Sequence, residues 1–219
     1  MLTLHYHPFS SYCQKVLIAL YERDLAFTPN LVDFGNPDHA AALEALWPMM
    51  HFPVVTDDAT GRTIPESSII IEYCDQHFPG AAPLIPADRD AALEVRLMDR
   101  VFDDFIQTPM QRLVNERMRP DDEKDARNDA EARALLSKTY HLLEERLAGR
   151  TWAAGDAFTL ADCAAAPGLF YANWVHPFRG QYPVLTAYFD RLLARPSFAR
   201  AVEEARPYRS FFPGGAPEA

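Results

Sequence analysis

The sequence predicts an α/β domain followed by an all-helical domain. Three observations support this division. Strand and helix patterns alternate through the first third of the chain, residues 79–88 contain three prolines in ten positions, and every later periodic segment has helical spacing. The 219 residues, 48% of them hydrophobic, have the composition of an ordinary globular protein. We therefore predict domains at 1–80 and 89–219, joined by a linker at 81–88.

The first domain opens with a strand and a helix. Apolar and polar side chains alternate over residues 2–6, which is the period of a half-buried strand, and Pro8 closes the run. Ser10 or Ser11 then provides an N-cap for a helix that ends near Arg23. We expect an apolar stripe on this helix at Val16, Leu17, Leu20 and Tyr21.

Five further elements complete the first domain. We expect a strand over residues 26–32 and a short helix over 40–46. Two short strands at 53–56 and 63–64 form a hairpin, and a last helix covers 67–77. The order of elements is therefore β-α-β-α-β-β-α.

The second domain shows helical periodicity throughout. Thr159 and Asp162 have the spacing of a capping box, and Pro167 predicts a kink or an early end to the helix that follows. We expect Asp103 and Asp104 to be solvated or at a subunit interface. The apolar stripes lie at Leu97, Val101, Phe105 and Ile106, at Leu136, Tyr140, Leu143 and Leu147, and at Leu185, Tyr188, Phe189, Leu192 and Leu193. Five aromatic residues are expected in the core rather than in a substrate pocket, although any of them that lies near Ser10 would line such a pocket: Phe102, Phe105, Phe170, Tyr171 and Trp174.

The charge distribution argues against nucleic acid and anionic membranes as partners. The formal net charge is -10, and residues 1–80 hold only the cations Lys15, Arg23 and Arg62 against ten carboxylates. An anion bound in the first domain therefore meets few permanent positive charges. Because no leader pattern and no run of 18 apolar residues occurs, we expect a cytoplasmic protein.

Several kinds of catalytic and metal site lack their sequence signatures. The chain has no GxGxxG or Walker loop, no GxSxG elbow and no HExxH helix. Its three cysteines fit neither a disulfide framework nor a zinc site. His5 and His7 have no partner at ligand spacing, so we expect no metal.

The order of elements in the first domain is that of thioredoxins, whose CxxC motif stands at the N-terminus of the first helix. Here these four residues read Ser10-Ser11-Tyr12-Cys13, so a hydroxyl replaces the nucleophilic thiol and we expect Cys13 in the core. A serine suits this place if the thiol arrives on the substrate. Lowering a thiol pKa of about 8.5 by about two units needs about 2.7 kcal/mol, which one charge-assisted hydrogen bond and a helix N-terminus supply.

At these residues the chain resembles the glutathione transferase superfamily over almost its whole length. Residues 10–16 are similar to the serine-type classes, theta and zeta. Residues 47–55, WPMMHFPVV, look like the family's Asn-Pro-x-x-x-Val-Pro-x-Leu segment. Residues 66–73, ESSIIIEY, match its Glu-Ser-x-x-Ile-x-x-Tyr signature. The resemblance implies a thioredoxin-like N-terminal domain that binds glutathione and an all-helical C-terminal domain that forms the electrophile site.

The resemblance also implies roles for individual residues. Ser10 would activate glutathione, and Pro53 would be the family's cis-proline, which leaves the backbone of Phe52 free for the cysteinyl part. His51 stands beside this proline and is a candidate contact for a glutathione carboxylate. Tyr6 has the spacing of the activator in tyrosine-type classes and remains an alternative to Ser10.

Three further expectations concern the ligand and the reaction. Ser67 can cap a helix whose amides receive a carboxylate, and Glu66 can pair with an ammonium, which together suit the γ-glutamyl group. Ser11 is a second alternative activator, or only a helix cap. The implied activity is detoxifying transfer of glutathione to a hydrophobic electrophile by a homodimer. Alternatives are a glutathione-dependent isomerase, dehalogenase or peroxide reductase, or a noncatalytic binding protein.

Overall fold

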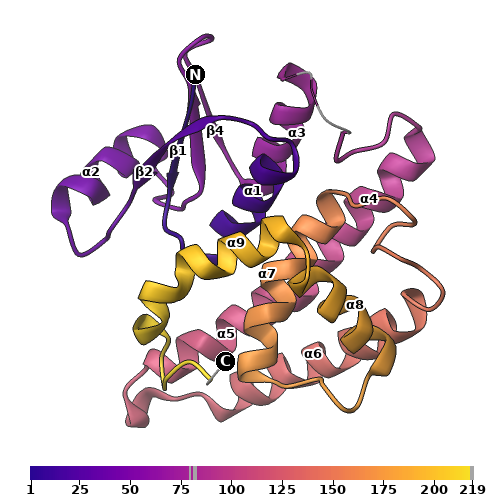
Figure 1. Ribbon diagram of the computed structural model, residues 1–219. Coiled ribbons are helices and arrows are strands. Elements are labelled where there is room, and N and C mark those ends of the chain that lie inside the picture. The colour runs from indigo at the N-terminus through magenta and orange to yellow at the C-terminus, as the bar shows by residue number, and fades with distance from the viewer. Residues whose placement is uncertain (79, 81–82, 218–219) are drawn as a thin grey trace.

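A four-stranded sheet forms the centre of the first half of the chain (Figure 1). The computed structural model describes residues 1–78, 80 and 83–217. Positions 81 and 82 of the predicted linker lie outside the described residues. The strands have the spatial order β2-β1-β3-β4; β1 pairs parallel with β2, and β3 pairs antiparallel with both β1 and β4. Their bounds are β1 Leu2–Tyr6, β2 Phe27–Leu31, β3 Val54–Asp57 and β4 Arg62–Pro65.

Three helices accompany the sheet, and the predicted β-α-β-α-β-β-α order is confirmed. Helices α1 (Ser11–Glu22) and α3 (Ser67–His77) lie on one face, and α2 (Pro37–Leu46) lies on the other (Figure 1). Helix α2 begins three residues earlier than predicted, because the Asn36 side chain accepts a hydrogen bond from the Asp38 amide and Pro37 suits the first helical turn. Strand β2 is an edge strand that pairs only with β1 among the described strands, so the missing N–H of Pro29 is tolerated there.

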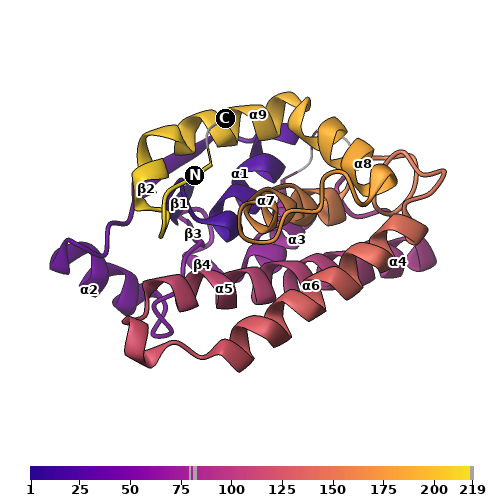
Figure 2. The same cartoon turned by 90° about the horizontal axis from the view of Figure 1, so that it is seen from below.

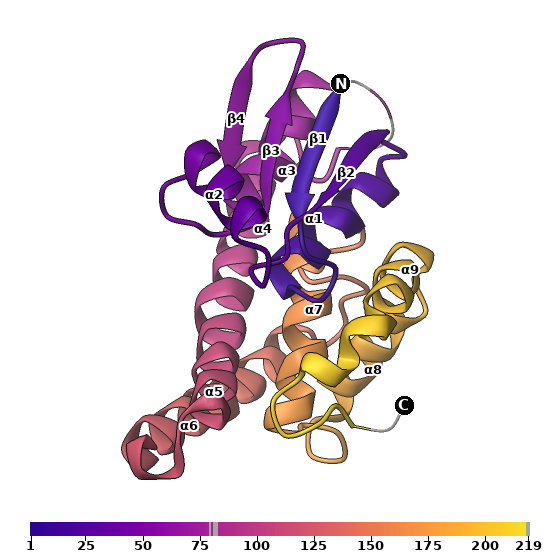
Figure 3. The same cartoon turned by 90° about the vertical axis from the view of Figure 1, so that its left-hand side faces the viewer.

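The second half is helical, as predicted (Figures 2 and 3). Figure 3 shows the sheet above the helices, with α7 pointing up toward α1. The described helices are α4 (Arg89–Phe102), α5 (Thr108–Met118), α6 (Ala126–Arg146), α7 (Leu160–Val175), α8 (Pro183–Leu193) and α9 (Pro196–Ala205). A π-helical segment, η1 (Asp103–Gln107), joins α4 to α5, and 3₁₀ turns η2 and η3 cover Asp121–Glu123 and Arg206–Phe211. Within the described residues, every helix is too short or too polar to cross a membrane.

Helix α1 is enclosed by both halves of the molecule. Every side chain from Cys13 to Leu20 is buried, so the predicted one-sided stripe is too narrow. The reason is that α3 covers one side of α1 while α7 and α9 cover others. The helix whose N-terminus carries the serines is thus held by both halves.

Helix α7 begins at the predicted capping box. The Asp162 carboxylate accepts from the Thr159 amide at 2.9 Å and from the Tyr188 hydroxyl at 2.7 Å. Burial raises the pKa of Asp162, although these donors act in the opposite direction. The predicted early end at Pro167 is wrong, since α7 continues to Val175 among packed neighbours that outweigh one lost backbone bond.

The predicted stripe along α4 and η1 is half right. Val101 and Ile106 are buried as predicted, whereas Leu97 and Phe105 are 47% and 44% exposed and Met98 and Phe102 enter the core instead. Apolar side chains occur on both adjacent faces of this helix, so periodicity alone does not identify the buried one. Phe105 is accordingly not a core aromatic residue, whereas Phe102 is.

A buried ion cluster joins the two halves. Lys15 on α1 is 1% exposed, and its Nζ lies 2.6 Å from Asp99 Oδ1 and 2.8 Å from Asp103 Oδ2. It also donates to Ser68 Oγ on α3 at 2.9 Å, and Arg100 pairs with both carboxylates. The expectation of a solvated or interfacial Asp103 is therefore wrong, because the cation that pairs with it arrives from α1, 88 positions away in the chain.

Replacing the central cation should cost much of the stability of the protein. We expect Lys15→Met to lower the free energy of unfolding by about 3–5 kcal/mol, because it leaves two buried carboxylates without their main partner. Urea denaturation followed by circular dichroism measures this change. Lys124→Met is the matched control, since Lys124 and Asp121 form an exposed pair. Equal losses in the two variants would contradict the role given to Lys15.

Candidate functional site

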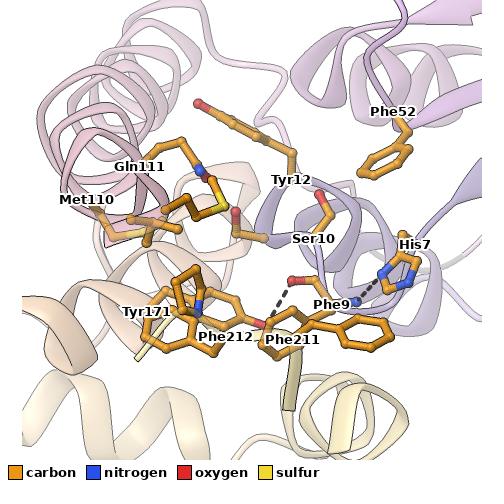
Figure 4. A pocket seen from close by; sticks show the side chains of 14 residues that line it. His7, Phe9, Ser10, Tyr12, Phe52, Met110, Gln111, Tyr171, Phe211 and Phe212 are labelled. Atoms are coloured by element: carbon orange, nitrogen blue, oxygen red, sulfur yellow. Dashed lines mark hydrogen bonds between the residues drawn. The ribbon is translucent and has the colours of Figure 1, made fainter. Parts of the chain in front are cut away.

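A cavity of about 310 Å³ opens at the N-terminus of α1, between the two halves (Figure 4). Its walls come from the β1–α1 connection and α1, from the segment before β3, from α5 and α7, and from the end of the chain. The lining residues are His7, Phe9, Ser10, Ser11, Tyr12, Phe52, Met110, Gln111, Val114, Met118, Tyr171, Phe211, Phe212 and Pro213. Most of these side chains are apolar, and the hydroxyls lie at the end formed by α1.

Ser10 is the N-cap of α1 and lines the cavity. Its backbone is extended, and its Oγ accepts from the Cys13 amide at 3.4 Å. Accepting this bond leaves the hydroxyl proton for another acceptor. The first-turn amides of α1 add a positive field at the same place.

Ser11 also lines the cavity but has a different environment. It is the first residue of α1, and its buried Oγ accepts from the Gln107 side-chain amide of η1. Ser10, not Ser11, therefore makes the side-chain cap of the helix.

Cys13 points away from the cavity into the core, as predicted. The side chain is fully buried, and burial raises the pKa of the Cys13 thiol to about 12, although the Ser10 hydroxyl acts in the opposite direction. A thiol that holds its proton so firmly is a poor nucleophile.

The segment before β3 has the geometry that the resemblance implies. The peptide bond between Phe52 and Pro53 is cis. The Phe52 ring lines the cavity and stacks on Phe34 at 5.1 Å between ring centroids, while Pro53 is buried. No hydrogen bond within the described chain uses the Phe52 N–H or C=O. His51 is exposed next to this segment and does not line the cavity.

Glu66 and Ser67 mark the start of α3, outside the cavity lining. Glu66 occupies the N-cap position with φ 69°, its side chain is exposed, and it makes no side-chain cap bond. Ser67 is the first residue of the helix, so the prediction that Ser67 caps α3 is wrong. Its neighbour Ser68 is bonded to Lys15 and Asp99, which fixes this first turn against α1 and α4.

Tyr6 opens onto a second cavity, of about 640 Å³, between the β1–β2 edge and α9. There it is half-buried, with Tyr21, Arg200 and Glu204 among its neighbours. Burial and the nearby Glu204 carboxylate raise the pKa of Tyr6. Tyr6 and Ser10 therefore face different cavities, although only four positions separate them.

The cavity beside Ser10 contains no permanent charge among the described residues that line it. Lys15 forms ion pairs with Asp99 and Asp103, and Arg23 is buried and paired with Asp75. Burial lowers the pKa of His7, with Asp33 acting in the opposite direction, which keeps this ring neutral. Any anionic group bound near the site must therefore rely on backbone amides and neutral donors.

Three lining residues come from distant parts of the chain. Tyr171 was expected in the core or, if it lay near Ser10, on the pocket wall; its buried hydroxyl donates to Phe9 O at 3.1 Å and accepts from Gln14 at 3.0 Å. Its ring nevertheless forms part of the cavity wall. Phe211 and Phe212 reach the cavity from the end of the chain, where no pattern in the sequence indicates a site.

The described residues contain no cluster of three or more His, Cys, Asp or Glu side chains suited to a metal ion. Donors that face the cavity are hydroxyls, an amide and an imidazole, which suit a polar organic ligand better than a cation.

Comparison with known proteins identifies the family. Residues 4–82 match the glutathione S-transferase N-terminal domain, and residues 106–196 match the glutathione S-transferase C-terminal domain. A solved glutathione S-transferase from Methylobacterium radiotolerans, in complex with glutathione sulfonate, is 30% identical over 92% of this chain and 94% of its own, with a TM-score of 0.79. The chain therefore belongs to the glutathione S-transferase superfamily.

Two other relatives illustrate its range. A glutathione S-transferase from Methylobacillus flagellatus with glutathione bound is 25% identical, with a TM-score of 0.84 over 92% of this chain and 98% of its own. A probable maleylacetoacetate isomerase from Drosophila melanogaster is 26% identical over 90% of this chain and 86% of its own.

Proposed function

We propose that this protein binds glutathione, ionises its thiol and transfers it to a hydrophobic electrophile. The observation that carries the proposal is the Ser10 hydroxyl, which stands at the N-terminus of α1 and faces a cavity lined mostly by apolar side chains. Bound glutathione in the Methylobacillus relative supports the choice of ligand.

Binding of glutathione divides into three contacts. The unpaired backbone N–H and C=O of Phe52 hold the cysteinyl part beside Ser10. The first-turn amides of α3 and the Ser67 hydroxyl donate hydrogen bonds to the γ-glutamyl carboxylate, and the exposed Glu66 carboxylate forms an ion pair with the γ-glutamyl ammonium. His51, beside the Phe52 segment, contacts the second carboxylate. This arrangement needs no lysine or arginine at the ligand.

The chemical step needs little from the protein beyond ionising the thiol. The thiol proton leaves to solvent, and the Ser10 hydroxyl donates to the thiolate that remains. The thiolate electron pair then forms a sulfur–carbon bond with the electrophile, and a leaving group departs with the electrons of its own bond. A free thiol is only a few per cent ionised at pH 7, so lowering its pKa by about two raises the thiolate fraction more than tenfold.

The wall opposite the hydroxyls selects the electrophile. Met110, Val114, Met118 and Phe212 offer apolar and aromatic contacts and no cation. We infer that neutral, flat electrophiles fit this wall and that substrates with carboxylates do not. A glutathione-dependent isomerase of a carboxylated diene, the activity suggested by the Drosophila relative, is therefore the second candidate.

A paired substrate screen tests this choice. We expect measurable turnover with a neutral halogenated aromatic compound and at least tenfold lower kcat/KM with a cis-dienoic acid. An unpaired carboxylate in an apolar cavity is destabilised by at least about 1.4 kcal/mol, which corresponds to a factor of ten. Organic peroxides form a third arm and report reductase activity. Faster turnover of the dienoic acid would favour the isomerase.

Removal of the Ser10 hydroxyl tests the activator. We expect Ser10→Ala to lower kcat/KM between about tenfold and a hundredfold, since one hydrogen bond to a charged group contributes about 1.5–3 kcal/mol. Tyr6→Phe is the matched control and should stay near the wild-type value, because Tyr6 faces the second cavity. The opposite pattern would make Tyr6 the activator.

Ionisation of bound glutathione separates catalysis from simple binding. The ultraviolet difference spectrum of the wild-type protein should show thiolate at pH 7. Binding of glutathione without any thiolate would support the noncatalytic alternative instead.

We further propose a homodimer in the cytoplasm, with glutathione bound mainly by residues 1–80, a linker at 81–88 and the electrophile wall supplied by 89–219. The exposed side chains of Ile69 on α3 and of Leu93 and Leu97 on α4 support the dimer. The Arg96–Glu72 pair joins these two helices on the same surface. Apolar side chains exposed together are typical of an interface.

A charge placed on this surface should prevent association. We expect Leu97→Glu to elute as a monomer in size-exclusion chromatography with light scattering, while Leu142→Glu, on an equally exposed leucine of α6, keeps the wild-type mass. A wild-type monomer would contradict the proposed dimer.

A further inference from the structure

A buried glutamine reaches the active-site end of α1 from the helical half. Gln107 is 3% exposed, and its Nε2 donates to Ser11 Oγ. Its Oε1 is buried without a partner among the described residues and lies against Gly168, where an added Cβ would come within 3.5 Å of this oxygen. The amide therefore lies at van der Waals distance from α7, in a space that would also accommodate a Cβ at Gly168.

The placement of Gln107 follows from the π-helical segment η1. Asp103 and Gln107 lie four positions apart on η1, and Lys15 and Ser11 lie four positions apart on α1. Asp103 pairs with Lys15, and Gln107 pairs with Ser11, so the segment is joined to α1 at two places one turn apart. Wide π turns of this kind occur often at functional sites.

The direction of the hydrogen bond determines what Ser11 can do. Because Ser11 accepts from Gln107, its own proton is not used by any hydrogen bond within the described chain. A hydroxyl that accepts a hydrogen bond is polarised and becomes a better donor. Ser11 also lines the cavity that Ser10 lines, so its hydroxyl can donate a hydrogen bond to a ligand bound there.

We propose that Gln107 is a positioning residue that orients Ser11 as a second hydroxyl donor to the glutathione thiolate, next to Ser10. This inference rests on the proposed function. The thiolate then receives two hydroxyl protons in addition to the field of the α1 N-terminus, and the second donor depends on a residue of the helical half. No proton or electron is transferred in this step, because Ser11 keeps its proton.

The thiolate fraction of bound glutathione tests the role of the amide. We expect Gln107→Leu to lower the thiolate absorbance at pH 7 about threefold, because an increase of about one in a thiol pKa near 6.5 lowers the ionised fraction from about three quarters to about one quarter. Gln107→Glu should lower it at least as much, because a carboxylate accepts the Ser11 proton and diverts it from the cavity. The KM for glutathione should change little in either variant, since Gln107 does not contact the ligand.

A double-mutant cycle shows whether the amide acts through Ser11. In the Ser11→Ala protein, Gln107→Leu should lower the thiolate fraction no further. Gln14→Leu removes another buried glutamine, whose amide donates to Pro8 O and Tyr171 Oη, and reports the effect of such a loss on stability. Thermal unfolding of each variant confirms that it is folded before titration.

Three outcomes would overturn the inference. They are a normal thiolate fraction in Gln107→Leu, an undiminished effect of Gln107→Leu in the Ser11→Ala protein, and a normal thiolate fraction in Gln107→Glu, which would show that the amide accepts from Ser11. If Ser10→Ala loses thiolate while these variants keep it, the proposed function stands without Gln107. If the wild-type protein forms no thiolate, the proposed function itself fails.

Discussion

The buried ammonium of Lys15 is the interaction on which the arrangement of the two halves depends. It joins α1 to Asp99 on α4, to Asp103 on η1 and to Ser68 on α3. Burying these charges is costly, and only their mutual pairing offsets the cost. Since α3 begins at Glu66 and Ser67 and η1 carries Gln107, the cluster fixes the positions of these segments relative to α1.

The N-terminus of α1 shows how one position in a common fold changes the chemistry. A serine caps the helix where a nucleophilic thiol stands in thioredoxins, and the remaining thiol of Cys13 is buried and protonated. In the proposed mechanism the protein supplies hydrogen-bond donors, and the nucleophile comes from the substrate. The apolar walls of the cavity are suited to a reaction that is driven by ionisation of that nucleophile and by proximity.

Elements set by local pattern were predictable from the sequence, and contacts between distant segments were not. Alternation in β1 and the capping box at Thr159 depend on neighbouring residues, whereas the cis bond before Pro53 was expected from the family resemblance. The pairing of Asp103 with Lys15 depends on how the halves dock, as does the arrival of Phe212 at the cavity. Helix caps lie between these cases, because Ser67 sits one residue inside the helix it was expected to cap.

The two edges of the sheet carry a consequence for assembly. Pro29 lies in edge strand β2, and Pro65 ends the opposite edge strand, β4. A proline has no amide proton to offer to an incoming strand, so each edge is a poor template for strand addition. The sheet is therefore poorly suited to extension by a second copy, which agrees with the proposal that copies associate through α3 and α4.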